Sequence, residues 1–170
     1  SAIQLDFNAI AKGFCVDKIA ELLSQKGISD FLVEVGGEIT TKGTKFGKPW
    51  VIGIQAPTVT QDGENNASYS FAITNKSIAT SGNYRNYIEE GGRRFTHIID
   101  PKNGYPEETN LLSVTVIADD CATADAFATA FMVMGIEKTE KLLQFHPELA
   151  AFFIYSDGTQ MLTKKSTNFP

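Results

Sequence analysis

The sequence predicts an α+β fold, in which a mixed, mostly antiparallel sheet packs against helices in a single domain spanning residues 1–170. Residues 10–26 place apolar side chains with the period of a helix, which is the first observation. The second is a series of short segments, bounded by turn residues, that alternate as strands do. The third is length: 170 residues can enclose one core, and no repeat, linker or low-complexity tract divides them.

The first half of the chain is expected to form one helix followed by four strands. The helix at 10–26 ends at Gly27, and the strands cover 31–36, 38–41, 50–55 and 69–74, with a hairpin loop at 58–68. Gly36-Gly37 predicts either a β-bulge or a close backbone approach to a ligand. The apolar residues that share one side of the helix are Ile10, Ala11, Phe14, Ile19, Leu22 and Leu23.

The second half is expected to form strands, a pair of helices and a closing hairpin. Gly135 separates the two helices, and Asp157-Gly158 is a strong turn signal between the last two strands. The expected strands cover 94–99, 112–118, 150–155 and 159–163, and the expected helices cover 121–134 and 136–145.

Composition excludes some classes of protein. The net charge is −5 and the 15 Lys and Arg residues are scattered, which argues against a nucleic-acid surface. No apolar run approaches the roughly 20 residues of a membrane span. Cys15 and Cys121 are expected as two buried small hydrophobes, with a disulfide left open, and His97 and His146 are too far apart for a zinc motif.

Asp125 is unusual because it lies on the otherwise small and apolar helix 121–134. A buried carboxylate needs a hydrogen-bond partner, an opposite charge or a metal. One interpretation is that Asp125 favours the helix N-terminus, although Asp119 or Asp120 already fits the cap position. The other is a hard-cation site, because Thr129 lies one turn further on and adds a second oxygen ligand.

Two further stretches carry candidate functional residues. Residues 6–14 combine an acid, a helix start and Lys12, which suits phosphate binding, although a capped helix with a solvated lysine is common. A polar turn is expected at 81–85. His97 lies on a strand that ends in an Asp-Pro turn, where a structural role is more usual than a catalytic one.

Six motifs occur in an order and spacing that resemble the FAD:protein FMN transferases of bacteria, the ApbE family. They are Asp-Phe-Asn-Ala-Ile-Ala-Lys-Gly (6–13), Val-Gly-Gly-Glu-Ile (35–39), Thr-Ser-Gly-Asn-Tyr (80–84), His-Ile-Ile-Asp-Pro-Lys-Asn-Gly-Tyr-Pro (97–106), Ser-Val-Thr-Val-Ile-Ala (113–118) and Ala-Thr-Ala-Asp-Ala-Phe-Ala-Thr-Ala (122–130). Each motif is modest alone, but the six in order are specific.

The resemblance implies Mg²⁺-dependent transfer of FMN from FAD to a Thr or Ser of a partner flavoprotein, with release of AMP. It implies that the metal is held by Asp125, Thr129 and the backbone carbonyl of Ala9, completed by FAD phosphates. Phosphoryl transfer needs positioning and charge neutralisation, which suits these groups. By the same resemblance Asp6, Lys12 and Ile99 contact FAD, and His97 is the candidate general base.

The family carries a long N-terminal portion before the first of these motifs, so the chain resembles the C-terminal part of such a protein. The resemblance also implies a periplasmic or extracytoplasmic location, with the full-length protein anchored to the membrane by lipidation. Two alternatives remain from the sequence. One is hydrolysis of FAD by a Mg²⁺-dependent pyrophosphatase, and the other is a fragment that binds flavin or metal without turnover.

Overall fold

The computed structural model describes residues 5–55, 67–82, 87–90, 93–96, 104 and 110–170. Within these ranges, no helix is both long enough and apolar enough to span a bilayer. The elements are α1 (Ala11–Gln25), β1 (Phe31–Val35), β2 (Glu38–Lys42), β3 (Trp50–Gln55), β4 (Ala67–Ile73), β5 (Ser77–Gly82), β6 (Tyr87–Glu90), β7 (Arg93–Thr96), β8 (Leu111–Ala118), α2 (Cys121–Leu143), β9 (Ala150–Ser156) and β10 (Met161–Lys165).

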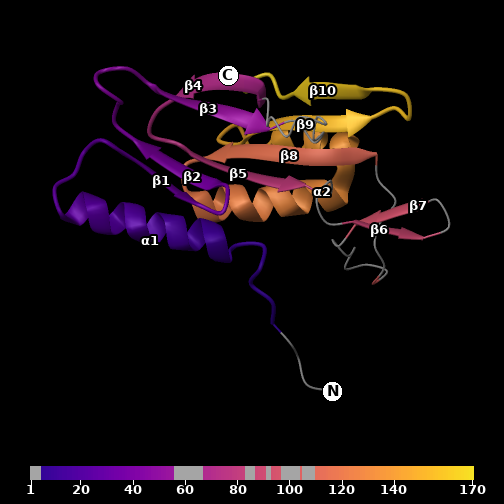
Figure 1. Ribbon diagram of the computed structural model, residues 1–170, viewed down its shortest axis with the longest axis horizontal. Helices are drawn as coiled ribbons and strands as arrows, with labels where there is room; N and C mark the ends of the chain where they lie inside the picture. Colours follow the sequence, from indigo (N-terminus) through magenta and orange to yellow (C-terminus); the bar gives the residue numbers. More distant parts are fainter. Residues whose placement is uncertain (1–4, 56–66, 83–86, 91–92, 97–103, 105–109) are drawn as a thin grey trace, which may run out of the picture.

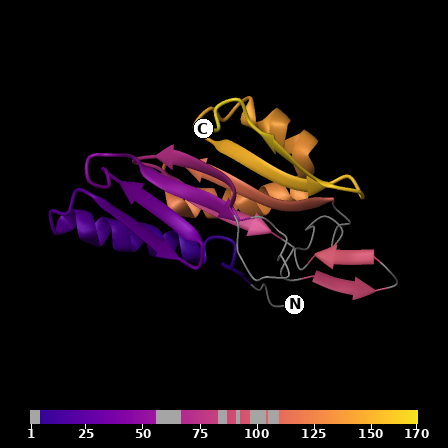
Figure 2. The same cartoon turned by 45° about the horizontal axis from the view of Figure 1, so that its top comes forward.

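Six strands form the main sheet in the order β1-β2-β5-β8-β9-β10, and β3-β4 and β6-β7 form two separate hairpins. Every pairing between described strands is antiparallel. In Figure 2, α1 and β1 lie at one end of the sheet and β10 at the other. The α+β class predicted from the sequence is confirmed.

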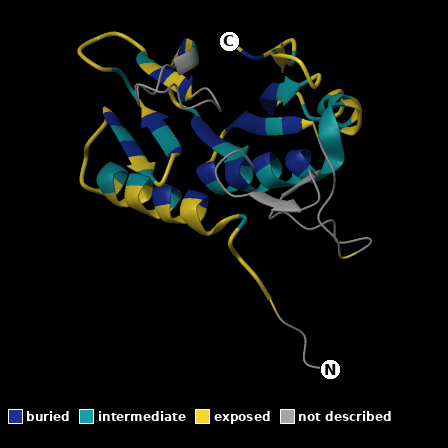
Figure 3. Ribbon diagram, turned by 45° about the vertical axis from the view of Figure 1, so that its right-hand side comes forward, coloured by how far each residue is buried: buried dark blue, intermediate teal, exposed yellow. Residues whose placement is uncertain are grey.

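The sheet is covered on both faces, which explains why β8 and β9 are buried along most of their length. α2 packs on one face, where Ala128 and Phe131 meet Val116 and Phe153. The β3-β4 hairpin packs on the other, and its apolar residues share a second cluster with the sheet and with Phe169 near the C-terminus. Figure 3 shows the resulting band of buried residues through the centre of the molecule.

The strand β5 lies between β2 and β8 and was not predicted. The polar turn expected at 81–85 was wrong for Ser81 and Gly82, which end β5, and residues 83–85 lie outside the described ranges. The sequence of β5, Ser-Ile-Ala-Thr-Ser-Gly, is too polar to resemble a central strand. Hydroxyl pairs satisfy these side chains: Ser77 with Thr40 at 2.8 Å, and Thr80 with Thr115 at 2.8 Å. Burial of the strand therefore leaves these hydroxyls hydrogen-bonded.

The other predicted helices and strands are confirmed to within a few residues, whereas of the hairpin loop expected at 58–68, residues 58–66 lie outside the described ranges and residues 67–68 belong to β4. The two helices expected on either side of Gly135 form one element, α2, with a kink at that glycine, whose φ of 73° and ψ of 172° are not helical. Thr139, fully buried, donates a hydrogen bond of 2.7 Å to the carbonyl of Gly135 and so satisfies a carbonyl at the kink. β7 confirms the first part of the strand expected at 94–99, and residues 97–99 lie outside the described ranges.

The face of α1 that packs into the protein is not the one the apolar pattern indicated. Phe14 is 54% exposed and Leu22 is also exposed, whereas Gly13 and Val16 are buried against the fold. The buried side of α1 is narrow because a second helix crosses it closely. Cys15 is also exposed, which corrects the expectation of two buried cysteines; Cys121 is buried and both thiols are free.

Candidate functional site

The candidate site is built where α1 crosses the start of α2, and Gly13 makes that crossing possible. A Cβ placed on Gly13 would lie 2.7 Å from the carbonyl carbon of Cys121 and 2.9 Å from Cα of Ala122. A real Cβ atom essentially never approaches a non-bonded atom this closely, and both neighbours are backbone atoms, which cannot rotate away. A residue without a side chain at position 13 therefore sets the spacing of the two helices.

Hydrogen bonds run in both directions across the crossing. The amide of Gly13 donates to Oδ2 of Asp125 at 3.0 Å. In return, the amides of Cys121 and Ala122 donate to the two carboxylate oxygens of Asp17 at 2.8 and 2.9 Å. Asp17 thus satisfies two free N–H groups at the start of α2 from a different helix. This role of Asp17 was not predicted, because residues 17 and 121 are far apart in the chain.

Asp120 supplies the local cap of α2. Its Oδ1 accepts from the amide of Thr123 at 2.8 Å, as expected from the sequence. Asp125 is therefore not needed as a cap, and its position one turn further into the helix calls for another explanation.

Asp125 is only 3% exposed. Burial raises the pKa of its carboxyl, and the hydrogen bond from Gly13 and the charge of Lys12 offset part of this rise. Ile10 is the N-cap of α1, and its carbonyl accepts the first helical hydrogen bond, from the amide of Phe14 at 2.9 Å. The amide of Gly13 is therefore one of the free N–H groups of the first turn, and Asp125 supplies its acceptor. Ala9 precedes the cap, so its carbonyl does not take part in the hydrogen bonds of the helix.

Thr129, the third predicted ligand, lies one turn after Asp125 on α2, and its hydroxyl is 3.0 Å from the hydroxyl of Ser81 at the end of β5. Carboxylate, hydroxyl and carbonyl oxygens are the donor types that Mg²⁺ accepts. Among the described residues, no three His, Cys, Asp or Glu side chains gather in a metal-binding group. The residues present fit a cation held by mixed oxygen donors rather than by a carboxylate cluster.

Lys12 extends from the first turn of α1 to the sheet. Its ammonium donates to Oε1 of Glu38 at 2.6 Å. Burial raises the pKa of the Glu38 carboxyl, the Lys12 charge opposes this rise, and the negative charge of Asp125 adds to it. Glu38 was not among the residues predicted from the sequence. It could have been found as a charged residue that directly follows Gly36-Gly37 and begins a strand on the side that is buried.

The remaining predicted residues are placed as follows. Asp6 is exposed and accepts from the amide of Asn8 at 2.7 Å, so in this structure it holds the turn before α1. His97 and Ile99 lie outside the described residues. Gly36-Gly37 is neither a bulge nor an open loop. It is the two-residue turn between β1 and β2, with φ of 63° and 102°, values that favour glycine.

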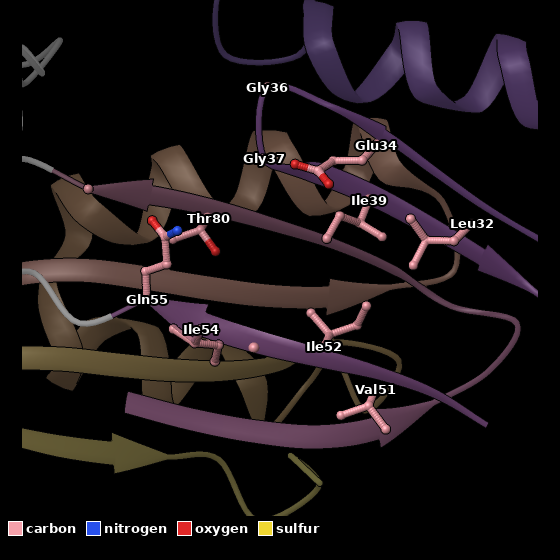
Figure 4. A pocket seen from close by; sticks show the side chains of 12 residues that line it. Leu32, Glu34, Gly36, Gly37, Ile39, Val51, Ile52, Ile54, Gln55 and Thr80 are labelled. Atoms are coloured by element: carbon pink, nitrogen blue, oxygen red, sulfur yellow. The ribbon is translucent and has the colours of Figure 1, made fainter. Parts of the chain in front are cut away.

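The turn at Gly36-Gly37 also forms one end of a cavity of about 770 Å³ between the main sheet and β3 (Figure 4). Leu32 and Ile39 of the sheet lie on one side of this cavity and Ile52 of β3 on the other. Gly36 and Gly37, where the sequence allowed a close approach to a ligand, line this cavity, whereas the described residues predicted to contact metal or FAD do not. A Cβ on Gly36 would lie 3.3 Å from Cδ of Lys12, so the turn separates the cavity from the Lys12 side chain.

Comparison with known proteins agrees with the motifs. The sequence model of the ApbE family matches residues 1–153. The chain is 42% identical to the FAD:protein FMN transferase of Haemophilus influenzae over 168 residues, covering 98% of this chain and 48% of that protein. It is 40% identical to the protein of the same name in Escherichia coli strain K12, over 98% of this chain and 47% of the relative. The chain therefore spans about half the length of these relatives.

Solved structures show the same fold. The apo form of the flavinyl transferase ApbE of Pseudomonas stutzeri superposes with a TM-score of 0.82 at 40% identity, covering 96% of this chain and 50% of the other. The flavin transferase ApbE of Vibrio cholerae gives 0.83 at 37% identity, covering 97% and 51%. The ordered motifs, the match over nine-tenths of the residues and the shared fold lead to one conclusion: the chain belongs to the ApbE family.

Proposed function

We propose that this chain forms part of an enzyme that transfers FMN from FAD to a Thr or Ser hydroxyl of an acceptor flavoprotein and releases AMP. The relatives that carry the name FAD:protein FMN transferase support this reaction. The observation that carries the proposal is the buried Asp125 carboxylate, which is hydrogen-bonded to the amide of Gly13 beside the Lys12 ammonium. A negative group and a positive group at one helix start suit a metal–pyrophosphate complex.

We assign Asp125, Thr129 and the Ala9 carbonyl as the groups that hold Mg²⁺, with phosphate oxygens of FAD completing its coordination. When bound, Mg²⁺ would neutralise charge on the pyrophosphate that is cleaved. The fit rests on the chemistry of the donors: a buried carboxylate, a hydroxyl one turn away, and a carbonyl that lies just before the N-cap of α1 and outside its helical hydrogen bonds.

The nucleotide would be bound by residues at the start of α1. Lys12 offers a point charge to the pyrophosphate, and its half-exposed side chain is accessible to a ligand. Asp6 and Ile99 complete the proposed FAD contacts. The hydrogen bonds that Asp6 makes to Asn8 hold the turn leading into α1, which fixes the approach to Lys12.

His97 is the proposed general base. The acceptor hydroxyl loses its proton to the imidazole as its oxygen forms a bond to the FMN phosphorus, and the bond from this phosphorus to the AMP oxygen breaks. The electron pair of the broken bond leaves with AMP. Only the attacking group differs if water takes the place of the acceptor, so transfer and hydrolysis share these residues.

The test uses the full-length protein with FAD, Mg²⁺ and a candidate acceptor flavoprotein, and mass spectrometry of the acceptor. An acceptor that gains the mass of FMN supports transfer, and FMN released in solution without a modified acceptor indicates a pyrophosphatase. Asp125→Ala should abolish Mg²⁺-dependent cleavage. His97→Ala should slow transfer by about 10²–10⁴-fold while FAD binding is retained.

Glu137→Ala is the matched control for Asp125→Ala, because it removes an exposed carboxylate from the same helix. It should leave cleavage unchanged. An Asp125→Ala protein that keeps the wild-type dependence on Mg²⁺ would remove Asp125 from the metal site.

The proposed location outside the cytoplasm, with a lipid anchor, is supported by the family resemblance. Fractionation of cells that produce the full-length protein tests it.

A further inference from the structure

Glu38 is the buried group whose role neither the motifs nor the proposed reaction explains. Its side chain is 2% exposed. One carboxylate oxygen, Oε1, accepts from Lys12 at 2.6 Å, whereas Oε2 is buried and has no hydrogen-bond partner among the described residues. A buried carboxylate oxygen without a donor is costly to the folded state. A fold that keeps such a group is expected to gain something else from it.

The first turn of α1 connects Glu38 to the proposed metal site. Lys12 and Gly13 are consecutive: the side chain of Lys12 donates to Glu38, and the backbone of Gly13 donates to Asp125. The Glu38 carboxylate therefore fixes the side chain at the same point where Asp125 fixes the main chain. Displacement of one of these groups would change the position of the other.

The aliphatic part of the Lys12 side chain is held in place as well as its ammonium. A Cβ added to Gly36 would lie 3.3 Å from Cδ of Lys12 and 3.7 Å from Oε2 of Glu38, so the β1-β2 turn passes close beside the ion pair. The Lys12 side chain nevertheless remains 48% exposed. An ammonium carries three N–H donors, and within the part of the chain that the structure describes, that of Lys12 donates to Glu38 alone. Its other N–H groups are thus available to a ligand.

We propose that Glu38 is a positioning residue, which holds the Lys12 ammonium in place so that its free N–H groups meet the pyrophosphate of the bound nucleotide. This inference rests on the proposed function. A free lysine loses much of its rotamer freedom when it binds a phosphate, and Glu38 imposes that order before the ligand arrives. Loss of the positioning should weaken nucleotide binding about tenfold, the scale set by ordering one lysine side chain.

The opposite role is physically possible and gives the opposite result. If Glu38 only neutralised Lys12, its carboxylate would compete with phosphate, and its removal would tighten binding. Glu38→Met keeps the buried volume but removes the acceptor, and Glu38→Gln keeps a neutral acceptor. Positioning predicts that affinity falls in the order Glu, Gln, Met, whereas competition predicts the reverse order.

A double-mutant cycle in the full-length protein separates positioning from a purely structural role. Calorimetry measures FAD binding with Mg²⁺ for wild type, Glu38→Met, Lys12→Met and the double variant. Because Glu38 acts through Lys12, the double variant should bind FAD as Lys12→Met does, with no further loss. Losses that multiply would overturn the inference. Glu34→Gln, an exposed acid on β1, is the control and should bind FAD normally.

A second measurement needs no nucleotide. An amine-acylating reagent is applied to wild type and to Glu38→Met, and peptide mapping follows the rate at Lys12, with Lys18 as the internal reference. An ammonium held by a buried carboxylate should react more slowly than a released one, so the substitution should accelerate acylation at Lys12 and not at Lys18. Equal rates at Lys12 would overturn the positioning role. Absence of FAD binding by the wild-type protein would instead contradict the proposed function.

Discussion

Replacement of Gly13 by alanine tests whether the spacing of α1 and α2 builds the site. The new Cβ would overlap the carbonyl oxygen of Cys121 and lie 2.7 Å from its carbonyl carbon. Carbon atoms in contact prefer about 3.5 Å, so the helices must separate by at least about 0.8 Å. The three hydrogen bonds that cross the interface, now 3.0, 2.8 and 2.9 Å, would lengthen by a similar amount. They would then exceed the range of real hydrogen bonds.

The destabilisation caused by this clash should exceed the stabilisation that alanine gives a helix relative to glycine. Overpacking costs about 1–3 kcal/mol and each weakened hydrogen bond to a carboxylate adds to it, whereas alanine gains about 1 kcal/mol in helix propensity over glycine. We expect Gly13→Ala to lower the free energy of unfolding by about 2–4 kcal/mol. Urea denaturation followed by circular dichroism measures this, and calorimetry with Mg²⁺ should show weaker binding.

Ala11→Gly is the control, because it changes helix propensity in the same helix at an exposed position. It should cost about 1 kcal/mol or less and leave cation binding intact. If Gly13→Ala is as stable as the wild type, or more stable, the close crossing does not exist as described and the account of the site is wrong.

Substitution of Asp17, labelling of the two cysteines and titration of Asp157 provide three further tests. Asp17→Ala removes the acceptors of two amides at the start of α2 and should cost about 1–2 kcal/mol in thermal unfolding, whereas the exposed Glu21→Ala should change little. Burial raises the pKa of Cys121 to about 12, so iodoacetamide should label Cys15 alone in the folded protein, and double labelling before unfolding would contradict the burial. Hydrogen bonds from Thr159 and Gln160 lower the pKa of Asp157 from 3.8 to about 2. Asp157 therefore contributes stability above pH 3.8 that is lost as the pH falls toward 2, and acid titration of Asp157→Ala should lack this part of the pH dependence.

The sequence was informative where a local pattern decides the structure. Asp157-Gly158 predicted the last hairpin, Gly135 predicted a break in α2, and the small apolar surroundings of Asp125 predicted its burial. These signals lie within a few residues of the feature that they predict. The position of Asp125 on an apolar helix was enough to question its role before any contact was known.

Contacts between residues distant in the chain decide the features that the sequence did not predict. The period of α1 indicated a helix, but Phe14 and Leu22 are exposed because the crossing of α2 at Gly13 determines which side is buried. Ser77–Gly82 is a central strand because β2 and β8 pair with it on either side and its hydroxyl groups are hydrogen-bonded. The polar sequence of this segment did not indicate these partners. Glu38 accepts from Lys12, 26 positions earlier, and Asp17 accepts from residues 104 and 105 positions later.

The bonds between α1 and α2 also have a consequence for the order in which the protein folds. They join residues separated by 112, 104 and 105 positions, so each closes a loop of more than a hundred residues. Closure of such long loops is entropically costly and occurs late relative to local structure. On the ribosome, α1 can form early, but Asp125 cannot accept from Gly13 until the start of α2 has been synthesised. The N-terminal part of the proposed site is therefore completed only after the C-terminal third of the chain has been synthesised and α2 has packed against α1.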